Sequence, residues 1–314
     1  MGLPKEVNIT EVCPRDGFQS LPDHVPTETK IDIINRLIDC GFSQMEVTSF
    51  VHPKAVPQMK DADEVLKGVK KSNNVLFRAL VPNLRGLERA IAADVEKVKL
   101  MLSATDSHSL HNANAATMEA MDKFIPLVER AKESNTKVAG SIAVAFGCPY
   151  EGEVPTDRLL EICQRYEDMG ITDISLADTT GMAHPVLVKR VISTLREEKP
   201  HFHFSLHLHN TRGMAFANAI AGLEEGITDF DSSAGGIGGC PYAPNASGNI
   251  ATEDIVHGFE EMGIKTNIDL DAVIEVGRIL AEQFPAQSDS FILKAGKSKD
   301  LVTAPGKQVK IGEK

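Results

Sequence analysis

The stretch FHFSLHLH at residues 202–209 decides how this chain folds, because it combines a strand pattern with two candidate metal ligands. Side chains alternate along a strand, so His207 and His209 are expected to face the same side. Two imidazoles on one side can hold one metal ion if other strand ends supply oxygen ligands. Without such ligands, the plainer interpretation is two surface histidines on a half-exposed strand.

Seven further strand-like runs accompany residues 202–209, with helical patterns between them. The expected strands are residues 7–12, 45–50, 76–81, 97–103, 137–146, 173–178 and 229–234. The expected helices span residues 28–40, 84–93, 116–134, 156–169, 185–198 and 215–225, with apolar residues at helical spacing. Eight strands alternating with helices predict an α/β protein, a (β/α)8 TIM barrel with its helices outside.

Two more helical patterns, residues 251–262 and 270–284, are expected to close the barrel and to form a C-terminal helical extension. No Gly-, Ser- or Pro-rich linker divides the chain, so residues 1–284 are predicted to form one catalytic barrel with C-terminal helices. Residues 285–314 are predicted to be a C-terminal segment that ends in a partly mobile, basic tail. A doubly wound sheet is the alternative, but residues 12–16 lack its glycine-rich phosphate loop.

Composition restricts the class of ligand and the compartment. The 314 residues are 42% hydrophobic and carry a formal net charge of −11, which disfavours nucleic acid and anionic lipid as partners. The five cysteines form no CxxC pair, and no apolar run approaches the ~20 residues that a membrane span needs. We therefore expect a cytoplasmic protein that acts on a small molecule, with no membrane or nucleic-acid partner.

The ligands that His207 and His209 require are found after other strands. In a TIM barrel the functional residues gather at the carboxyl ends of the strands, where Asp16 follows the first strand and Asn249 follows the last. This oxygen and nitrogen set suits a divalent metal ion, with Mg²⁺ or Mn²⁺ favoured and Zn²⁺ or Co²⁺ as alternatives. The competing interpretation makes Asp16 a turn or N-cap residue and Asn249 the N-cap of the next helix.

Reactive side chains are expected at the same end of the barrel. Arg15 precedes Asp16, Glu46 lies in the second strand, and Asp178 ends the sixth. Arg15 would either stabilise negative charge on a carbonyl oxygen, as in an enolate, or form a salt bridge to Glu46.

The glycine-rich residues 234–249, AGGIGGCPYAPNASGN, carry another candidate. We expect them to form a flexible, lid-like loop that brings Cys240 to the mouth of the barrel. A thiol there could donate a proton to a carbanion or attack as a thiolate. Cys148 lies in a similar GCPY context and is expected to have a structural or substrate-lining role.

Six segments together resemble the 3-hydroxy-3-methylglutaryl-CoA lyase family: VCPRDGFQ (12–19), EVTSFV (46–51), GCPYEG (147–152), SLADTTG (175–181), HLH (207–209) and GGIGGCPYA (235–243) with ASGN (246–249). The likeness runs from about residue 7 to about residue 284. It implies a divalent-metal barrel that cleaves a 3-hydroxyacyl-CoA to acetyl-CoA and an oxo product, acetoacetate for the namesake substrate. The Gly-Gly-Cys-Pro loop distinguishes these lyases from related barrels that condense acyl-CoA with 2-oxo acids.

The resemblance also implies roles for particular residues. The metal ligands would be Asp16, His207, His209 and Asn249. The catalytic groups would be Arg15, Glu46, Asp178, His207 and Cys240. We expect substrate contacts from Gln19, Ser49, Asn83 and Ser175. Either His207 or Asp178 would remove the hydroxyl proton. Arg15, oriented by Glu46, would stabilise the acetyl-CoA enolate, and Cys240 would protonate it.

Three other functions stay open at this point. A related lyase could act on another 3-hydroxyacyl-CoA, such as citramalyl-CoA, giving acetyl-CoA and pyruvate. A catalytically silent barrel with a binding role is opposed by the intact ligand set, and a condensing enzyme by the loop that carries Cys240. We expect a homodimer or higher homo-oligomer with an acyl-CoA substrate.

Overall fold

The computed structural model describes residues 2–239 and 248–301. Within them, eight parallel strands follow one another in chain order around a closed barrel, in which β8 pairs with β1. The strands are β1 (Asn8–Glu11), β2 (Gln44–Ser49), β3 (Leu76–Leu80), β4 (Lys97–Ser103), β5 (Lys137–Ala143), β6 (Asp173–Asp178), β7 (His203–Leu208) and β8 (Asp229–Ser232). Each corresponds to a predicted strand, so the predicted barrel is confirmed.

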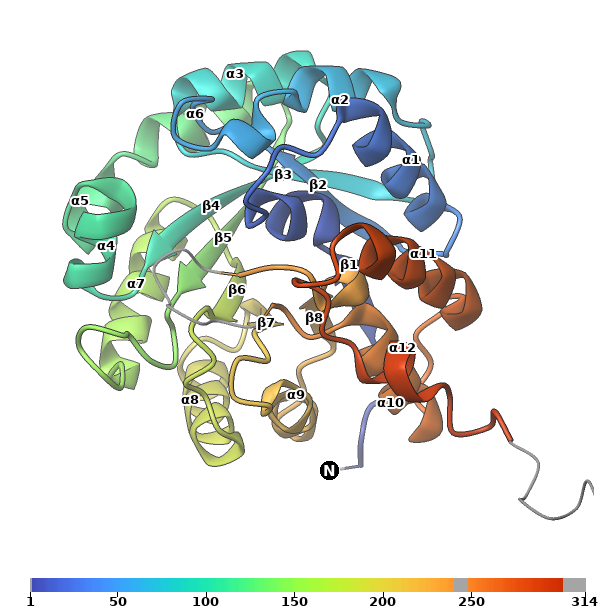
Figure 1. Cartoon of the computed structure of the whole chain (residues 1–314). Coiled ribbons are helices and arrows are strands. Elements are labelled where there is room, and N and C mark those ends of the chain that lie inside the picture. The colour runs from blue at the N-terminus through green and yellow to red at the C-terminus, as the bar shows by residue number, and fades with distance from the viewer. Residues whose placement is uncertain (1, 240–247, 302–314) are drawn as a thin grey trace, which may run out of the picture.

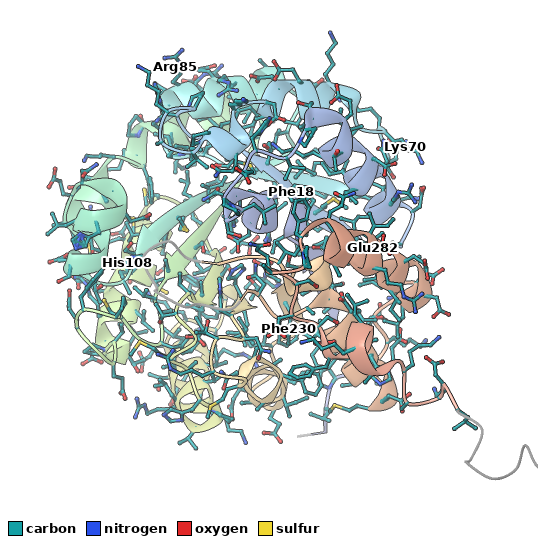
Figure 2. The ribbon with its side chains drawn as sticks, viewed as in Figure 1. Phe18, Lys70, Arg85, His108, Phe230 and Glu282 are labelled. Atoms are coloured by element: carbon teal, nitrogen blue, oxygen red, sulfur yellow. The ribbon has the colours of Figure 1, made fainter. Side chains whose placement is uncertain are left out.

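Helices form a ring around these strands (Figure 1). They are α1 (Thr27–Ile38), α2 (Ala62–Gly68), α3 (Leu84–Ala92), α4 (Asp106–Ala113), α5 (Thr117–Asp122), α6 (Ile125–Glu133), α7 (Thr156–Asp168), α8 (Pro185–Glu198), α9 (Ala215–Glu224), α10 (Thr252–Glu261), α11 (Leu270–Gln283) and α12 (Phe291–Ala295). Figure 2 shows Lys70 and Arg85 pointing outward from this ring, whereas Phe18 and Phe230 are buried in the core. None of the described helices combines the length and apolar character needed to cross a membrane.

The single helix predicted over residues 116–134 is wrong in detail. The structure has two helices there, α5 and α6, which are separated at Lys123 and Phe124. Pro126 lies in the first turn of α6 and has no N–H to bond to the carbonyl of Asp122. A continuous helix would need that bond, so α5 ends before the proline and α6 begins around it.

One carboxylate of α10 holds the start of α12 in the C-terminal segment. Asp254, in α10, accepts hydrogen bonds from the Ser290 hydroxyl at 3.0 Å and from the backbone N–H groups of Phe291 and Ile292 at 3.0 and 2.8 Å. Residues 302–314, which hold most of the predicted mobile tail, lie outside the described residues. The domain boundary at residue 284 stays a prediction.

Charged side chains close the amino end of the barrel. His203, at the start of β7, lies 3.3 Å from the Asp173 carboxylate and 3.0 Å from the Asp229 carboxylate. Lys97 forms an ion pair with the same Asp173 carboxylate at 2.5 Å. Hydrogen bonds to the two carboxylates raise the pKa of His203 to about 10.

We expect this arrangement to make stability depend on pH. The pKa of an unfolded histidine is about 6.5, and the folded value for His203 is about 10. The stabilisation is therefore complete below about pH 6.5 and is lost as the pH rises through about 10. The side chain is 56% exposed, so solvent weakens the effect. The melting temperature of wild type should exceed that of His203→Gln near pH 6 and converge with it above about pH 10. A constant difference across this range would contradict the prediction.

Candidate active site

Asp16 is placed at the barrel mouth by a tight turn after β1. The N–H groups of Arg15, Asp16 and Gly17 all bond to the carbonyl of Val12, at 3.0, 2.7 and 3.4 Å. They belong to a short π-helix, η1 (Cys13–Gly17), a form that is frequent at functional sites. Asp16 lies inside η1, so it is a turn residue, as one part of the competing interpretation expected, and the N-cap role that was the other part is wrong.

His207 and His209 meet Asp16 at this end of the barrel. One ligand atom of each residue lies within 4.8 Å of the other two. The Nε2 atoms of the two histidines are 3.1 Å apart, and His207 Nε2 is 3.8 Å from Asp16 Oδ2. Both imidazoles are buried, so they are not the surface histidines of the plainer interpretation.

Asn249 reaches the same point because the chain returns alongside β7. The Ile250 N–H bonds to the Leu208 carbonyl and the Asn210 N–H bonds to the Gly248 carbonyl, both at 3.0 Å. The Asn249 amide nitrogen then donates to Asp16 Oδ2 at 2.7 Å. The N-cap of α10 is the residue at 251, two positions later, so Asn249 does not cap that helix. The structure thus brings all four predicted ligands together.

Their chemistry fits a divalent cation. Burial lowers the pKa of His209 to about 3, which keeps the imidazole neutral with a lone pair to offer. Burial raises the pKa of Asp16, but the positive charge of Arg15 and the hydrogen bond from Asn249 are among the effects that outweigh it, and the pKa lies below its usual value. Within the described residues, the buried atoms Asn249 Oδ1 and His209 Nδ1 have no hydrogen-bond partner. A carboxylate, two imidazoles and an amide oxygen are ligands that a divalent ion accepts.

Arg15 stands beside this cluster and is held from two sides. Its guanidinium bonds to Asp16 and to Glu46. Glu46 also pairs with Arg78 at 2.6 Å and with Lys99 at 3.2 Å. Burial raises the pKa of Glu46, but the charges of Arg15, Lys99 and Arg78 together lower it below its usual value. Glu46 is therefore a carboxylate that orients Arg15, so the predicted salt bridge forms.

Three charged residues of the barrel interior were not predicted. Asp231, in β8, accepts from Arg78 at 2.7 Å and pairs with Lys99 at 3.1 Å, and it lies 3.2 Å from His207 Nδ1. A signal exists in the sequence, because β4 and β8 carry charges at alternate positions, 97 and 99 and 229 and 231. Charges at alternate positions lie on one side of a strand, so in a closed barrel each set points either outward to the helices or into the centre.

A cavity of about 100 Å³ opens beside the four ligand positions. Its wall includes Arg15, Asp16, His207 and His209, together with Gln19, Lys99, His108 and Asn112. Of the four predicted substrate contacts, Gln19 alone lines this cavity among the described residues.

The other predicted substrate contacts lie elsewhere. Ser49 is buried at the end of β2, and Asn83 is exposed and caps α3 by accepting from the Gly86 N–H at 2.9 Å. Ser175 lies three residues before the carboxyl end of β6 and therefore lines a small cavity at the amino end of the barrel. Strand register places Ser175 there, which opposes the prediction that it contacts the substrate.

Asp178 ends β6, where one of its oxygens is fixed. Oδ1 accepts from the backbone N–H groups of Met182 and Ala183 at 2.8 and 3.1 Å. Oδ2 is buried and has no hydrogen-bond partner in the described part of the chain. Burial raises the pKa of Asp178 to about 6.

Of the two cysteines in the GCPY segments, the structure describes Cys148 only. Cys240 lies outside the described residues. Cys148 is buried, and its sulfur accepts from the Thr105 hydroxyl at 3.1 Å and from the Tyr150 N–H at 3.4 Å. These bonds agree with a structural role for Cys148.

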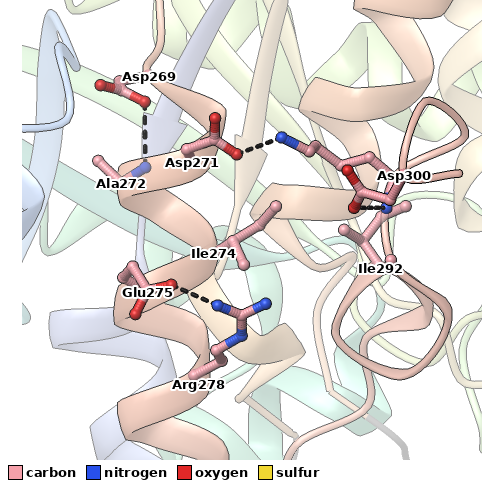
Figure 3. Close-up of a pocket in the computed structure, with 10 residues that line it drawn as sticks. Asp269, Asp271, Ala272, Ile274, Glu275, Arg278, Ile292 and Asp300 are labelled. Carbon is pink, nitrogen blue, oxygen red and sulfur yellow. Dashed lines mark hydrogen bonds and ion pairs between the residues drawn. The ribbon is translucent and has the colours of Figure 1, made fainter. Parts of the chain in front are cut away.

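A larger cavity of about 390 Å³ lies between α11 and α12, away from this site (Figure 3). Its charged side chains pair with one another, Asp271 with Lys297 and Glu275 with Arg278. Asp269 caps α11 through the Ala272 N–H. This cavity contains none of the predicted site residues.

Known proteins of one family are similar to this chain along nearly its whole length. The model of the family described as HMGL-like matches residues 6–280. The chain is 42% identical over 298 residues to a hydroxymethylglutaryl-CoA lyase of Bacillus subtilis, covering 95% of this chain and 100% of the relative. It is 39% identical to the human mitochondrial hydroxymethylglutaryl-CoA lyase, covering 93% of this chain and 90% of the relative.

Solved structures agree with these relatives. An HMG-CoA lyase of Acinetobacter baumannii, solved in complex with coenzyme A and 3-methylmalate, superimposes with a TM-score of 0.91 at 41% identity. The match covers 97% of this chain and 100% of that one. A Bacillus subtilis HMG-CoA lyase also gives a TM-score of 0.91 at 41% identity, covering 94% of this chain and 99% of that one.

Proposed function

This chain belongs to the HMGL-like family, and from that premise we propose that it cleaves 3-hydroxy-3-methylglutaryl-CoA to acetyl-CoA and acetoacetate with the help of a divalent metal ion. The observation that carries the proposal is the meeting of Asp16, His207, His209 and Asn249 with Arg15 beside one cavity. It occurs in a chain whose relatives along nearly its whole length are hydroxymethylglutaryl-CoA lyases.

The residues that would hold the ion are Asp16, His207, His209 and Asn249, with Mg²⁺ or Mn²⁺ proposed and Zn²⁺ or Co²⁺ as alternatives. When bound, the ion would act as a Lewis acid that polarises the substrate's 3-hydroxyl group. The hydroxyl proton must then pass to a base.

We assign proton removal to Asp178 rather than to His207. Nε2 of His207 faces the ligand cluster and Nδ1 faces Asp231, so both ring nitrogens are engaged. Asp178 does not itself line the cavity, whose wall includes its neighbours Ala177 and Thr179. Its Oδ2 has no hydrogen-bond partner in the described residues, and its raised pKa makes it a stronger base than an ordinary carboxylate.

Bond cleavage follows from this proton transfer. The bond between C2 and C3 breaks, C3 becomes the ketone of acetoacetate, and C2 becomes the enolate carbon of acetyl-CoA. Arg15 is proposed to stabilise the enolate oxygen, which carries the new negative charge. Cys240 is proposed to protonate C2, so one proton leaves the hydroxyl group and one is added to carbon.

Asp178 predicts how the rate depends on pH. A general base must be ionised, and the pKa of Asp178 is raised to about 6 by burial. We expect kcat/KM, which reports the pKa of the free enzyme, to fall tenfold per pH unit below about pH 6 and to level off above it. The residual activity of Asp178→Asn should lack this acid limb. An unchanged limb in the variant would assign the proton transfer to another group, with His207 the next candidate.

Cys240 predicts a difference between two cysteines in similar GCPY contexts. Cys240→Ser should fold and bind metal but lose most turnover, because a hydroxyl is a far weaker acid than a thiol near neutral pH. Cys148→Ser is the matched control and should retain turnover, since Cys148 is buried away from the cavity. Alkylation of the wild type should inactivate it, and substrate should protect. Near wild-type cleavage by Cys240→Ser would remove this thiol from the mechanism.

The substrate assignment is tested with a panel of thioesters. Purified protein with Mg²⁺ or Mn²⁺ is incubated with 3-hydroxy-3-methylglutaryl-CoA, citramalyl-CoA and other 3-hydroxyacyl-CoA esters, and acetyl-CoA release is measured. Release with acetoacetate from the first ester supports the proposal. Release from citramalyl-CoA alone would favour the related lyase, and no release from any ester would favour a catalytically silent barrel.

Two further predictions concern the setting of the enzyme. The homo-oligomeric state is proposed from the sequence and awaits measurement of the mass in solution. The cytoplasmic location is proposed in the same way, and the relatives include proteins named as cytoplasmic and as mitochondrial.

A further inference from the structure

A buried carboxylate stands directly behind His207. Asp231 lies opposite His207 in the register of β7 and β8. Its Oδ2 is 3.2 Å from His207 Nδ1, and its side chain is 1% exposed. The other ring nitrogen, Nε2, faces His209 and Asp16 at 3.1 and 3.8 Å. One imidazole therefore faces a carboxylate with one nitrogen and the ligand cluster with the other.

We propose that Asp231 is a positioning residue, which holds the proton of His207 on Nδ1 and so presents the lone pair of Nε2 to the divalent ion. A neutral imidazole carries one N–H, and a carboxylate can only accept, so the proton belongs on the nitrogen that faces Asp231. A ligating histidine commonly donates its second nitrogen to a carboxylate, which fixes both tautomer and ring orientation. The proposal rests on the proposed function in one respect, which is that a divalent ion binds at this site.

Arg78 and Lys99 keep Asp231 ionised, so that it can accept the proton-bearing nitrogen of His207 as a hydrogen-bond donor. They pair with Asp231 at 2.7 and 3.1 Å, so its charge is balanced without a proton from His207. The same two cations pair with Glu46, which holds Arg15. One buried set of charges therefore positions both a metal ligand and the cation proposed to meet the enolate.

The chain contains a matched control for Asp231. Asp229 lies two residues earlier on β8 and contacts His203, which lies four residues before His207. The Asp229 carboxylate is 3.0 Å from His203 Nε2, so it forms the same kind of pair. It lines the cavity at the amino end of the barrel, away from the ligand cluster.

The test compares the affinity of the metal-free full-length protein for Mn²⁺, by calorimetry, in wild type, Asp231→Asn and Asp229→Asn. We expect Asp231→Asn to weaken Mn²⁺ binding about 10- to 100-fold, the range found when such partners of metal ligands are removed. Asp229→Asn should bind Mn²⁺ like wild type. Equal affinity of Asp231→Asn and wild type would overturn the proposal.

A second measurement does not depend on the folding of Asp231→Asn. Nitrogen NMR of wild-type protein labelled at histidine reports which ring nitrogen carries the proton, and a His207→Gln spectrum assigns the signals. We expect His207 as the Nδ1–H tautomer, and the Nε2–H tautomer would overturn the proposal. Strong Mn²⁺ binding and this tautomer, without cleavage of any thioester, would instead refute the proposed function alone.

Discussion

Arg15→Met is expected to lower kcat by at least about two orders of magnitude, the loss seen when a donor to a developing oxyanion is removed. Arg15 is fixed between Glu46 and Asp16 and lines the cavity beside the ligands. Methionine keeps much of the side-chain length but carries no charge. The enolate charge arises as the bond breaks, so KM should change much less than kcat.

The measurement is steady-state kinetics of Arg15→Met with 3-hydroxy-3-methylglutaryl-CoA. Arg36→Met is the control, because Arg36 lies on the outside of α1 and pairs with Asp32 at an exposed site. It should keep wild-type kcat and KM. If KM rose in Arg15→Met while kcat held, Arg15 would be an anchor for bound substrate and not a stabiliser of the enolate.

Removal of divalent ions should abolish turnover. After EDTA treatment and dialysis, we expect no detectable acetyl-CoA release, with activity restored by Mg²⁺ or Mn²⁺. His209→Ala should weaken metal binding strongly, because it removes an imidazole from the cluster around Asp16. Cys148→Ala should leave metal binding and turnover nearly unchanged.

Two outcomes would contradict the metal assignment. Full activity in excess EDTA would show that the reaction does not use the proposed ion. Equal losses of metal binding in His209→Ala and Cys148→Ala would show that the effect is general destabilisation. Melting curves of both variants without metal distinguish loss of a metal ligand from general destabilisation, since loss of a ligand alone leaves the melting temperature of the metal-free protein unchanged.

The strands could be predicted because each combines β-branched or aromatic residues with turn residues on both sides. The same local patterns could not show where a helix breaks, and residues 116–134 became one predicted helix although Pro126 divides them. The short helices α2 and α4 were missed, since seven or eight residues give little helical periodicity. The sequence offered a turn at Asp16 only as an alternative, and it did not predict the π-helical form of that turn, because a π-helix has no sequence pattern of its own.

The residues of the candidate site were likewise predictable only in part from the sequence. The ligands follow strand ends, which alternation and the barrel prediction locate together, as for His207 and His209. Arg78, Lys99 and Asp231 lie within strands, where isolated charges are usually assigned to a solvated face. Their interior position follows only from barrel closure, which brings β3, β4 and β8 around one axis. The alternating charges of β4 and β8 can be seen in the sequence, but the sequence does not show which side of these strands faces the barrel centre.

Asp16 and Asn249 touch although 233 positions separate them along the chain. Asp16 follows β1 and Asn249 follows β8, and the two meet where β8 pairs with β1. The complete ligand set therefore cannot exist before the chain has been synthesised through residue 249 and the barrel has closed. Contacts of such long range form late and slowly in folding. An ion that binds only the closed form shifts the folding equilibrium toward it, by an amount that grows with the concentration of free ion. Cellular metal supply would then influence how much of this protein survives quality control, in addition to how fast each folded copy works.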